Sequence, residues 1–380
     1  MLSRIRAPAI AAAFALFAVA PAAVWADGES HGPTIYTVGV DHRPPLNHNF
    51  EYVDYFPRSG IKLHTGDVLN FAWGQTPDGL HTATLLQTGE TVPEALQKFP
   101  FVVPDADNSP TQLQLNPQVL APTNPGCGDS ATNPCTFDGS ADLNSGAFPT
   151  DGTSRFFTRI DAPAGSQLTF ICLIHPGMVG TATVVPRNRE ASEPEDVRER
   201  AGIQAVQDTV GALIAEAQAE RTSVRPNPDG TRTITMAAGT ATPFVEVAEM
   251  LPRNLHIQAG DTVTWVTKTI KDPHTVTFPS GDGPGEPIPM FCEAPGGDTP
   301  FTPPTTGPPC GNPALLEVHF EPAPGGSTVI STPSTFGTSG IISNPPAPFP
   351  NSYSFRFPNA GAFTYQCRIH DHMVGTILSS

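Results

Sequence analysis

Alternating apolar and polar residues recur along this 380-residue chain and predict short β-strands separated by Gly, Pro and Asp. In the first part of the chain the predicted strands are 34–40, 61–64, 67–73, 81–85, 155–160, 167–172 and 180–185. In the second part they are 254–257, 261–266, 274–278, 353–357, 362–367 and 374–378. The pattern therefore predicts an all-β protein in which one β-sandwich scheme occurs twice.

One segment between the two sets of strands has the period of a helix. Its apolar residues recur at helical spacing and are Ile203, Val206, Val210, Leu213, Ile214 and Ala217. Ser192 and Glu195 are spaced as a capping box, Pro194 falls in the first turn, and the helix is expected to end near Arg221. We predict an amphipathic helical linker over 190–222 whose apolar stripe packs on its own chain. A dimer-forming helix is the alternative.

These elements divide the chain into a first domain over 32–186 and a second over 231–380. Long inserts, about 90–153 and 280–351, interrupt the two domains and hold much of the chain's 44 prolines. Such segments are expected to be irregular in structure. They could shield a site or form a docking surface for a partner. The alternative is that they are surface insertions without a function of their own.

The first residues, 1–26, have the pattern of an export signal. Arg4 and Arg6 precede a short apolar run, and Val24 and Ala26 stand where a signal peptidase reads small residues. An uncleaved anchor is the alternative. No later segment is long and apolar enough to be an integral membrane span, so we expect an exported protein in the periplasm or outside the cell.

The formal net charge of −16 excludes a general nucleic-acid binder, which needs a basic surface. An acidic surface would steer the protein toward a partner with a basic docking surface. Maintenance of solubility explains the charge equally well. The sequence assigns no oligomeric state.

A repeated motif, C-x2-H-x2-M, carries the candidate chemistry. It stands first at Cys172, His175 and Met178, and again at Cys367, His370 and Met373. Each half also has a histidine upstream, His81 and His274, next to a predicted strand. A thiolate, two imidazoles and a weak thioether suit copper that alternates between its two oxidation states. The motifs therefore predict two metal sites, one in each half.

The chain resembles two cupredoxin, or blue copper, domains in tandem, of the plastocyanin and amicyanin kind. The halves align through Gly66 and Gly260, Asp67 and Asp261, Trp73 and Trp265, Ser145-Gly146 and Ser339-Gly340. The two-residue spacer between the loop histidine and methionine is similar to that of amicyanin. The resemblance implies two Greek-key β-sandwiches, one type 1 copper ion in each, and single-electron transfer between a redox donor and acceptor. It also implies that electrons leave through an exposed edge of His175 or His370.

One position departs from this family. Thr82 and Thr275 follow the upstream histidines where plastocyanin-like proteins often have asparagine. The sequence therefore does not predict which residue makes the hydrogen bonds that brace the cysteine loop.

The four remaining cysteines fall into two local pairs, Cys127 with Cys135 and Cys292 with Cys310. Each pair lies between the upstream histidine and the ligand loop of its half. In an oxidising compartment, one disulfide per domain is the simplest explanation. Additional metal ligands are the alternative, although no histidine stands beside either pair.

Two other functions use similar domains. A multicopper oxidase or nitrite reductase commonly has a histidine directly beside the type 1 cysteine, but the neighbours here are Ile171, Leu173, Gln366 and Arg368. We therefore expect an electron carrier without catalytic residues rather than an enzyme.

A copper buffer or delivery protein would use the same ligands without electron transfer.

Overall fold

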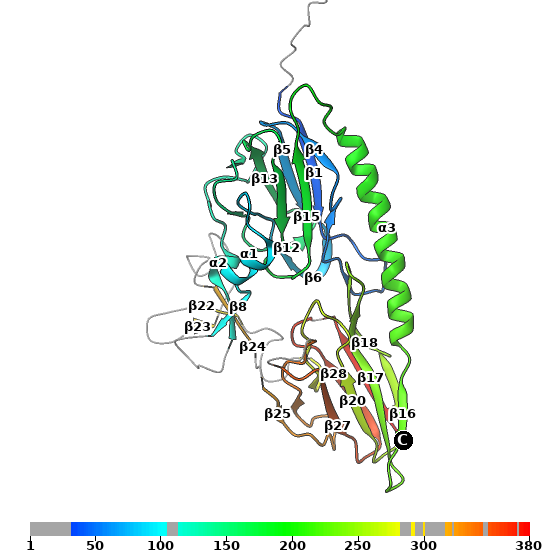
Figure 1. Cartoon of the computed structure of the whole chain (residues 1–380). Coiled ribbons are helices and arrows are strands. Elements are labelled where there is room, and N and C mark those ends of the chain that lie inside the picture. Colours follow the sequence, from blue (N-terminus) through cyan, green and yellow to red (C-terminus); the bar gives the residue numbers. More distant parts are fainter. Residues whose placement is uncertain are drawn as a thin grey trace, which may run out of the picture. The chain divides into compact units, whose positions relative to one another are not determined.

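The computed structural model describes residues 32–104, 113–281, 290–292, 299–300, 316–320, 323–344, 349–370 and 372–380. The predicted signal segment, 1–26, lies outside these residues. Residues 33–380 form one compact unit. Its described part consists mostly of β-strands, with one long helix and two short ones, so the predicted all-β class with a helical linker is confirmed (Figure 1).

The first half contains two sheets of five strands. One has the order β10-β13-β5-β1-β3 and the other β11-β7-β14-β15-β4. The bounds of the first are β10 Cys135–Phe137, β13 Arg155–Ile160, β5 Val68–Trp73, β1 Ile35–Val40 and β3 Tyr55–Phe56. Those of the second are β11 Leu143–Asn144, β7 Thr84–Leu85, β14 Gln167–Ile171, β15 Val179–Val184 and β4 Ile61–Leu63. A separate ribbon pairs β6 Gln75–His81 with β12 Phe148–Asp151.

The second half repeats this scheme with the orders β2-β18-β17-β20-β27 and β19-β29-β28-β21-β26-β25. The first sheet contains β2 Phe50–Glu51, β18 Glu246–Leu251, β17 Arg232–Ala241, β20 Thr262–Val266 and β27 Ser352–Arg356, and β16 Ser223–Pro226 pairs with β17. The second contains β19 Asn254–Ile257, β29 Val374–Ser379, β28 Gly361–Gln366, β21 Thr277–Phe278, β26 Gly337–Thr338 and β25 Gly325–Gly326. In both halves the first long strand pairs in parallel with the strand before the upstream histidine.

Each half has its own hydrophobic core, built around an aromatic residue two positions before the candidate ligand cysteine. Phe170 meets Phe71 with ring centroids 5.2 Å apart, and Tyr365 meets Trp265 at 5.1 Å. All four side chains are almost fully buried. The inward positions of the alternating pattern therefore build these two cores.

Core packing explains the tripeptide Val-Gly-Thr that follows each candidate ligand methionine. A side chain at Gly180 would come under 3.0 Å from the ring of Phe170, and one at Gly375 would do the same to Tyr365. Only glycine leaves room for these rings. The repeat thus preserves core packing as well as candidate ligands.

A seam of main-chain pairing joins the two halves. β2, which comes from the first half, pairs antiparallel with β18 of the second, with Glu51 opposite Glu246. Phe50 and Val247, the adjacent pair, are fully buried in a third hydrophobic cluster. Because β2 completes the edge of a sheet in the second half, the halves share structure close to the candidate ligands. The domain bounds given above stay a prediction.

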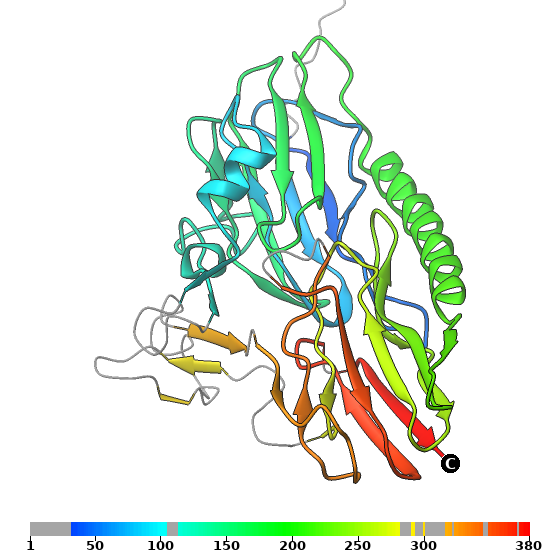
Figure 2. The same ribbon diagram turned by 60° about the horizontal axis from the view of Figure 1, so that its bottom comes forward.

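The long helix α3, Pro194–Ala219, lies beside strands of both halves, including β1 and β18 (Figures 1 and 2). The predicted capping box is wrong, since Glu193 is the N-cap and makes no side-chain cap. The Ser192 hydroxyl instead accepts the Lys62 backbone N–H at 2.9 Å, which attaches the helix start to β4.

The predicted apolar stripe of α3 does not pack on the chain. The side chains of Ile203, Val206, Val210, Leu213 and Ile214 are exposed, between 37 and 65%. The opposite face, with Ala205 and Ala212, is buried against the third cluster. Small alanine side chains let the helix approach the sheets closely, so the expectation about which face packs is corrected.

Arg58 connects the first half, the helix and the second half. Its guanidinium donates to Asp54 at 2.8 Å and to both carboxylate oxygens of Asp208 on α3 at 2.8 and 3.0 Å. It also lies 3.4 Å from the ring centroid of Phe244, just before β18. Burial is the main reason that the pKa of Asp54 is raised to about 7, with Arg58 opposing the shift.

Replacing Arg58 with alanine is expected to lower the free energy of unfolding by about 2–3 kcal/mol, because two mostly buried carboxylates would lose their cation. This loss of unfolding free energy is smaller than that expected for a fully buried ion pair, because the Arg58 side chain is 28% exposed. Chemical denaturation measures the change. The matched control is Arg198→Ala, which removes an exposed pair with Glu195 and should cost less than ~1 kcal/mol. Equal losses in both variants would contradict the connecting role.

The inserts are more regular than the sequence suggested. The first holds α1, Val92–Lys98, with a capping box from Thr91 and Glu94, and α2, Pro117–Leu120. Strands from both inserts pair in the order β23-β22-β24-β9-β8. Their bounds are β23 Thr299–Pro300, β22 Met290–Cys292, β24 Leu316–Phe320, β9 Leu113–Leu115 and β8 Val102–Pro104.

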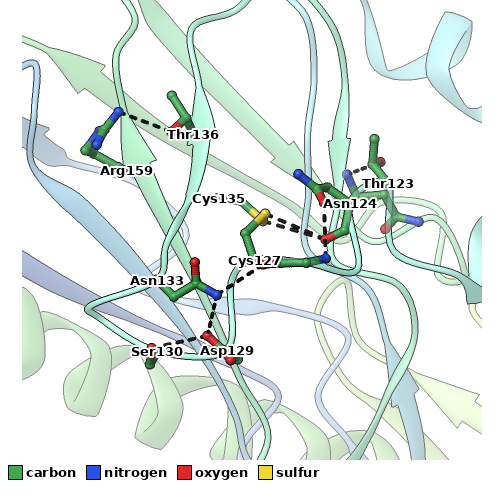
Figure 3. Close-up of a disulfide and its surroundings, with 11 residues drawn as sticks. Thr123, Asn124, Cys127, Asp129, Ser130, Asn133, Cys135, Thr136 and Arg159 are labelled. Atoms are coloured by element: carbon green, nitrogen blue, oxygen red, sulfur yellow. Dashed lines mark hydrogen bonds between the residues drawn. A yellow bond between two sulfur atoms is a disulfide. The ribbon is translucent and has the colours of Figure 1, made fainter. Parts of the chain in front are cut away.

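The structure joins Cys127 to Cys135 by a disulfide with a Cα–Cα distance of 4.9 Å (Figure 3). Asn133 lies inside the small loop and its side-chain amide donates to the carbonyl of Gly126 and to Asp129. Cys310 lies outside the described residues, so the predicted pair with Cys292 stays a prediction.

Candidate metal centres

The first site brings together the end of one strand and a loop distant from it in the first half. His81 ends β6, Cys172 follows β14, and His175 lies in the loop that leads to β15. Cys172 Sγ lies 3.8 Å from His81 Nδ1 and 3.7 Å from His175 Nδ1, and the two nitrogen atoms are 3.0 Å apart. Met178, which completes the predicted set, is fully buried in the same core.

The second site repeats this geometry. Cys367 Sγ lies 4.0 Å from His274 Nδ1 and 3.6 Å from His370 Nδ1, with 3.2 Å between the nitrogen atoms. Met373 is fully buried. All three of His274, Cys367 and His370 are buried as well, so both donor sets are shielded from water.

The donor spacing fits one metal ion per site. Bonds of about 2.0 Å to nitrogen and about 2.3 Å to sulfur in a trigonal plane put the two nitrogens about 3.5 Å apart and each nitrogen about 3.7 Å from sulfur. The observed separations are 3.0 and 3.2 Å between nitrogens, and 3.6 to 4.0 Å between nitrogen and sulfur. Two imidazoles, one thiolate and a thioether on the same loop are also the donors that suit copper.

Backbone hydrogen bonds hold the ligand loops in the same way in both halves. The N–H of Cys172 donates to the carbonyl of Met178 at 3.0 Å, and that of Met178 donates to the carbonyl of His175 at 3.1 Å. The corresponding bonds in the second loop, from Cys367 and Met373, are 2.9 and 3.0 Å. The short motif is therefore a closed turn that points its donors inward.

The threonines after the upstream histidines supply the bracing that the sequence left open. The Thr82 hydroxyl accepts the N–H of Leu173 at 2.8 Å, and the Thr82 backbone N–H points to Cys172 Sγ at 3.4 Å. Thr275 makes the same two contacts with Arg368 and Cys367, at 2.7 and 3.3 Å. Threonine thus fixes the cysteine loop and gives each sulfur an N–H partner.

Buried carboxylates lie beside the outer nitrogens of three of the four candidate ligand histidines. His81 Nε2 lies 3.1 Å from Asp41, and His274 Nε2 lies 3.2 Å from Glu246. His175 Nε2 lies 3.2 Å from Asp272 and 3.5 Å from Glu51. Such partners fix the tautomer that leaves Nδ1 free for a metal. Sequence reasoning missed these acids, because no spacing rule links them to the ligands.

The expected exposed histidine edge is wrong for both loops. His175 and His370 are only 5 and 6% exposed. His175 Nε2 faces Glu51 and Asp272 instead of solvent, and Asp272 belongs to the second half. His372 is exposed, and its carbonyl accepts the Asn49 side-chain amide at 2.9 Å.

Comparison with known proteins assigns no family. No family model matches the sequence, and no curated protein matches it. Similar solved structures include a Cu(I) methionine-to-alanine variant and a reduced tryptophan-to-tyrosine variant of amicyanin. Each is 15% identical, covers 42% of this chain and 92% of that chain, and has a TM-score of 0.20. At these values the likeness carries no argument, and the site stands on its geometry.

The electrostatics of both sites favour a thiolate. Burial alone would raise the pKa of Cys172 and Cys367, but hydrogen bonds and charge from the two histidines of each site hold it well below the usual value. Burial would likewise lower the pKa of the upstream histidines. Their carboxylate and sulfur partners instead raise it, to about 9 for His81 and about 10 for His274.

Metal affinity is therefore expected to rise with pH. Because a metal needs neutral imidazoles, loading displaces the protons that His81 and His274 hold below pH 9 and 10. Each proton released gives about a tenfold gain in affinity per pH unit, until the pH passes these pKa values. Competition with a chelator between pH 6 and 9 measures the slope. Affinity that does not change over this range would contradict the protonated metal-free state.

None of the helices in the described part of the chain is both long and apolar enough to cross a membrane.

Proposed function

We propose that each half binds one type 1 copper ion, through His81, Cys172, His175 and Met178 in the first site and His274, Cys367, His370 and Met373 in the second. The observation that carries the proposal is the repeated triangle of two Nδ1 atoms and one Sγ, with a buried methionine on the same loop. When bound, copper would supply a single-electron change of oxidation state.

The protein's own residues would support this chemistry in three ways. Burial excludes water from the donors. The N–H groups of Thr82 and Thr275 point at the sulfurs and stabilise the thiolate. The carboxylates on Nε2 hold the imidazole rings in position, so little rearrangement is needed when the charge of the site changes.

We further propose that the protein is an exported electron carrier of two cupredoxin-like domains that serves a redox donor and acceptor. The N-terminal signal pattern supports export, and the net charge of −16 supports partners with basic docking surfaces. Since both loop histidines are buried, partners would not contact a ligand edge directly.

Copper stoichiometry together with visible and EPR spectra of the full chain tests the proposal. Two copper ions per chain and an intense thiolate charge-transfer band are expected. Reversible one-electron oxidation of each site, with copper retained against a chelator, distinguishes a carrier from a copper delivery protein. A colourless copper complex, or rapid loss of copper to the chelator, would overturn it.

A further inference from the structure

The first site is completed by a residue of the second half. Asp272 Oδ1 lies 3.2 Å from Nε2 of His175, across the junction between the halves. In sequence, however, Asp272 stands two positions before His274, a candidate ligand of the second site. One short segment thus contacts the first site through the Asp272 side chain and supplies a candidate ligand, His274, to the second site.

The segment around Asp272 is held in place by contacts of its own. The backbone N–H of Lys271 donates to the Thr269 hydroxyl at 2.9 Å, and that hydroxyl in turn donates to Glu246. Lys271 Nζ lies against the first ligand loop, 3.2 Å from where a side chain on Gly177 would begin. The position of Asp272 beside His175 is therefore set by the second half.

The Asp272 carboxylate is buried, and its second oxygen has no hydrogen-bond partner within the described residues. A buried acid without a full set of partners is costly unless a specific contact requires it. The candidate ligand that it contacts directly is His175, at Nε2, and its charge also acts on His370 and His274. Glu51 also approaches this nitrogen but at 3.5 Å, and it is shared with His81 at 3.4 Å.

We propose that Asp272 is a positioning residue for the first site: it holds the imidazole of His175 from the second half, so metal binding at the first site depends on both halves. The inference rests on the proposed function only in that each site binds a metal. A first half without the second would keep all four candidate ligands and still lack this contact.

Zinc binding tests the inference without redox chemistry. Cys367→Ser and Cys172→Ser serve as parents, in which only the first or only the second site keeps its thiolate. In the first-site parent, Asp272→Ala is expected to weaken zinc affinity about 10- to 100-fold, as loss of a carboxylate partner of a ligand histidine does elsewhere. Asp272→Asn should restore most of it, because its amide oxygen still accepts the Nε2–H. The second-site parent should lose less than the first.

A spectroscopic readout separates positioning from a general structural effect. In the zinc-loaded first-site parent, the Nε2–H of His175 should give a proton NMR signal protected from solvent exchange. The signal should persist in Asp272→Asn and vanish in Asp272→Ala. The matched control is Glu249→Gln, which alters another buried carboxylate that binds Asn49 and Arg253, and should change neither affinity nor signal.

An equal or larger loss of zinc affinity at the second site would overturn the inference, since Asp272 would then act by shaping the segment before His274. Absence of zinc binding in both parent variants would also overturn the inference. Failure of the proposed function is distinct: a missing copper charge-transfer band, with zinc results as expected, would reject the blue copper assignment and leave the role of Asp272 standing.

Discussion

Replacing Cys172 with serine is expected to remove one copper ion per chain and about half of the thiolate charge-transfer absorption. The thiolate is the strongest donor of the first site, and a buried hydroxyl in its place is a poor ligand for copper. Cys367→Ser should have the same effect on the second site, and the double variant should be colourless. Metal analysis with visible and EPR spectra measures all three.

The control for this experiment is to replace Cys127 and Cys135 together. These sulfurs are bonded to each other and lie outside both donor sets. The double replacement is expected to lower stability, since the disulfide restrains the unfolded chain, and to leave the absorption unchanged. Copper retained by the protein that lacks both Cys172 and Cys367 would show that the triangles are not the metal sites.

Gly239→Ala is expected to weaken copper binding at the second site and to leave the first site unchanged. Gly239 lies in β17 with a φ of +72°, and a Cβ there would come under 3.0 Å from Nε2 of His274. The imidazole and Glu246, which holds it, would have to move. A displaced ligand should lower copper affinity at this site about 10- to 100-fold, measured by competition in the Cys172→Ser background.

The control variant Gly230→Ala measures the loss of stability that comes from backbone strain alone. Gly230 has a φ of +87°, but a Cβ there would meet no atom within 4 Å. Both alanine variants should lose roughly 1–2 kcal/mol of stability from the left-handed conformation. Only Gly239→Ala should alter the second site. Unchanged EPR signals from both sites in Gly239→Ala would refute the predicted displacement of His274.

The candidate ligands could be recognised from the sequence because the motif that holds them is local and repeated. Three of the four candidate ligands in each half lie on one short turn, where spacing alone brings the donors together, as in Cys172 and His175. The strands followed from alternation, since β13 and β19 begin and end where the pattern does. Local patterns of this kind do not depend on the arrangement of the rest of the chain.

The features that the sequence did not predict depend on distant contacts. β2 has two residues, and it forms because β18 lies opposite it. His175 contacts Asp272 of the second half and Glu51 of β2, and no spacing rule describes either contact. The helical period of α3 was predicted correctly, but the face that packs was not. The helix buries its alanine side chains and leaves the larger apolar side chains exposed, because small side chains allow it to lie close to the sheets.

The pairing of β2 with β18 affects how this chain could evolve. All six residues of β18 are buried, and without β2 the main-chain groups of Glu246 and Val247 would be left unpaired at the edge of the sheet. Such an edge recruits other chains and leads to aggregation. Recombination that separated the two halves would therefore produce fragments that are prone to aggregation. We expect the two halves to be inherited together.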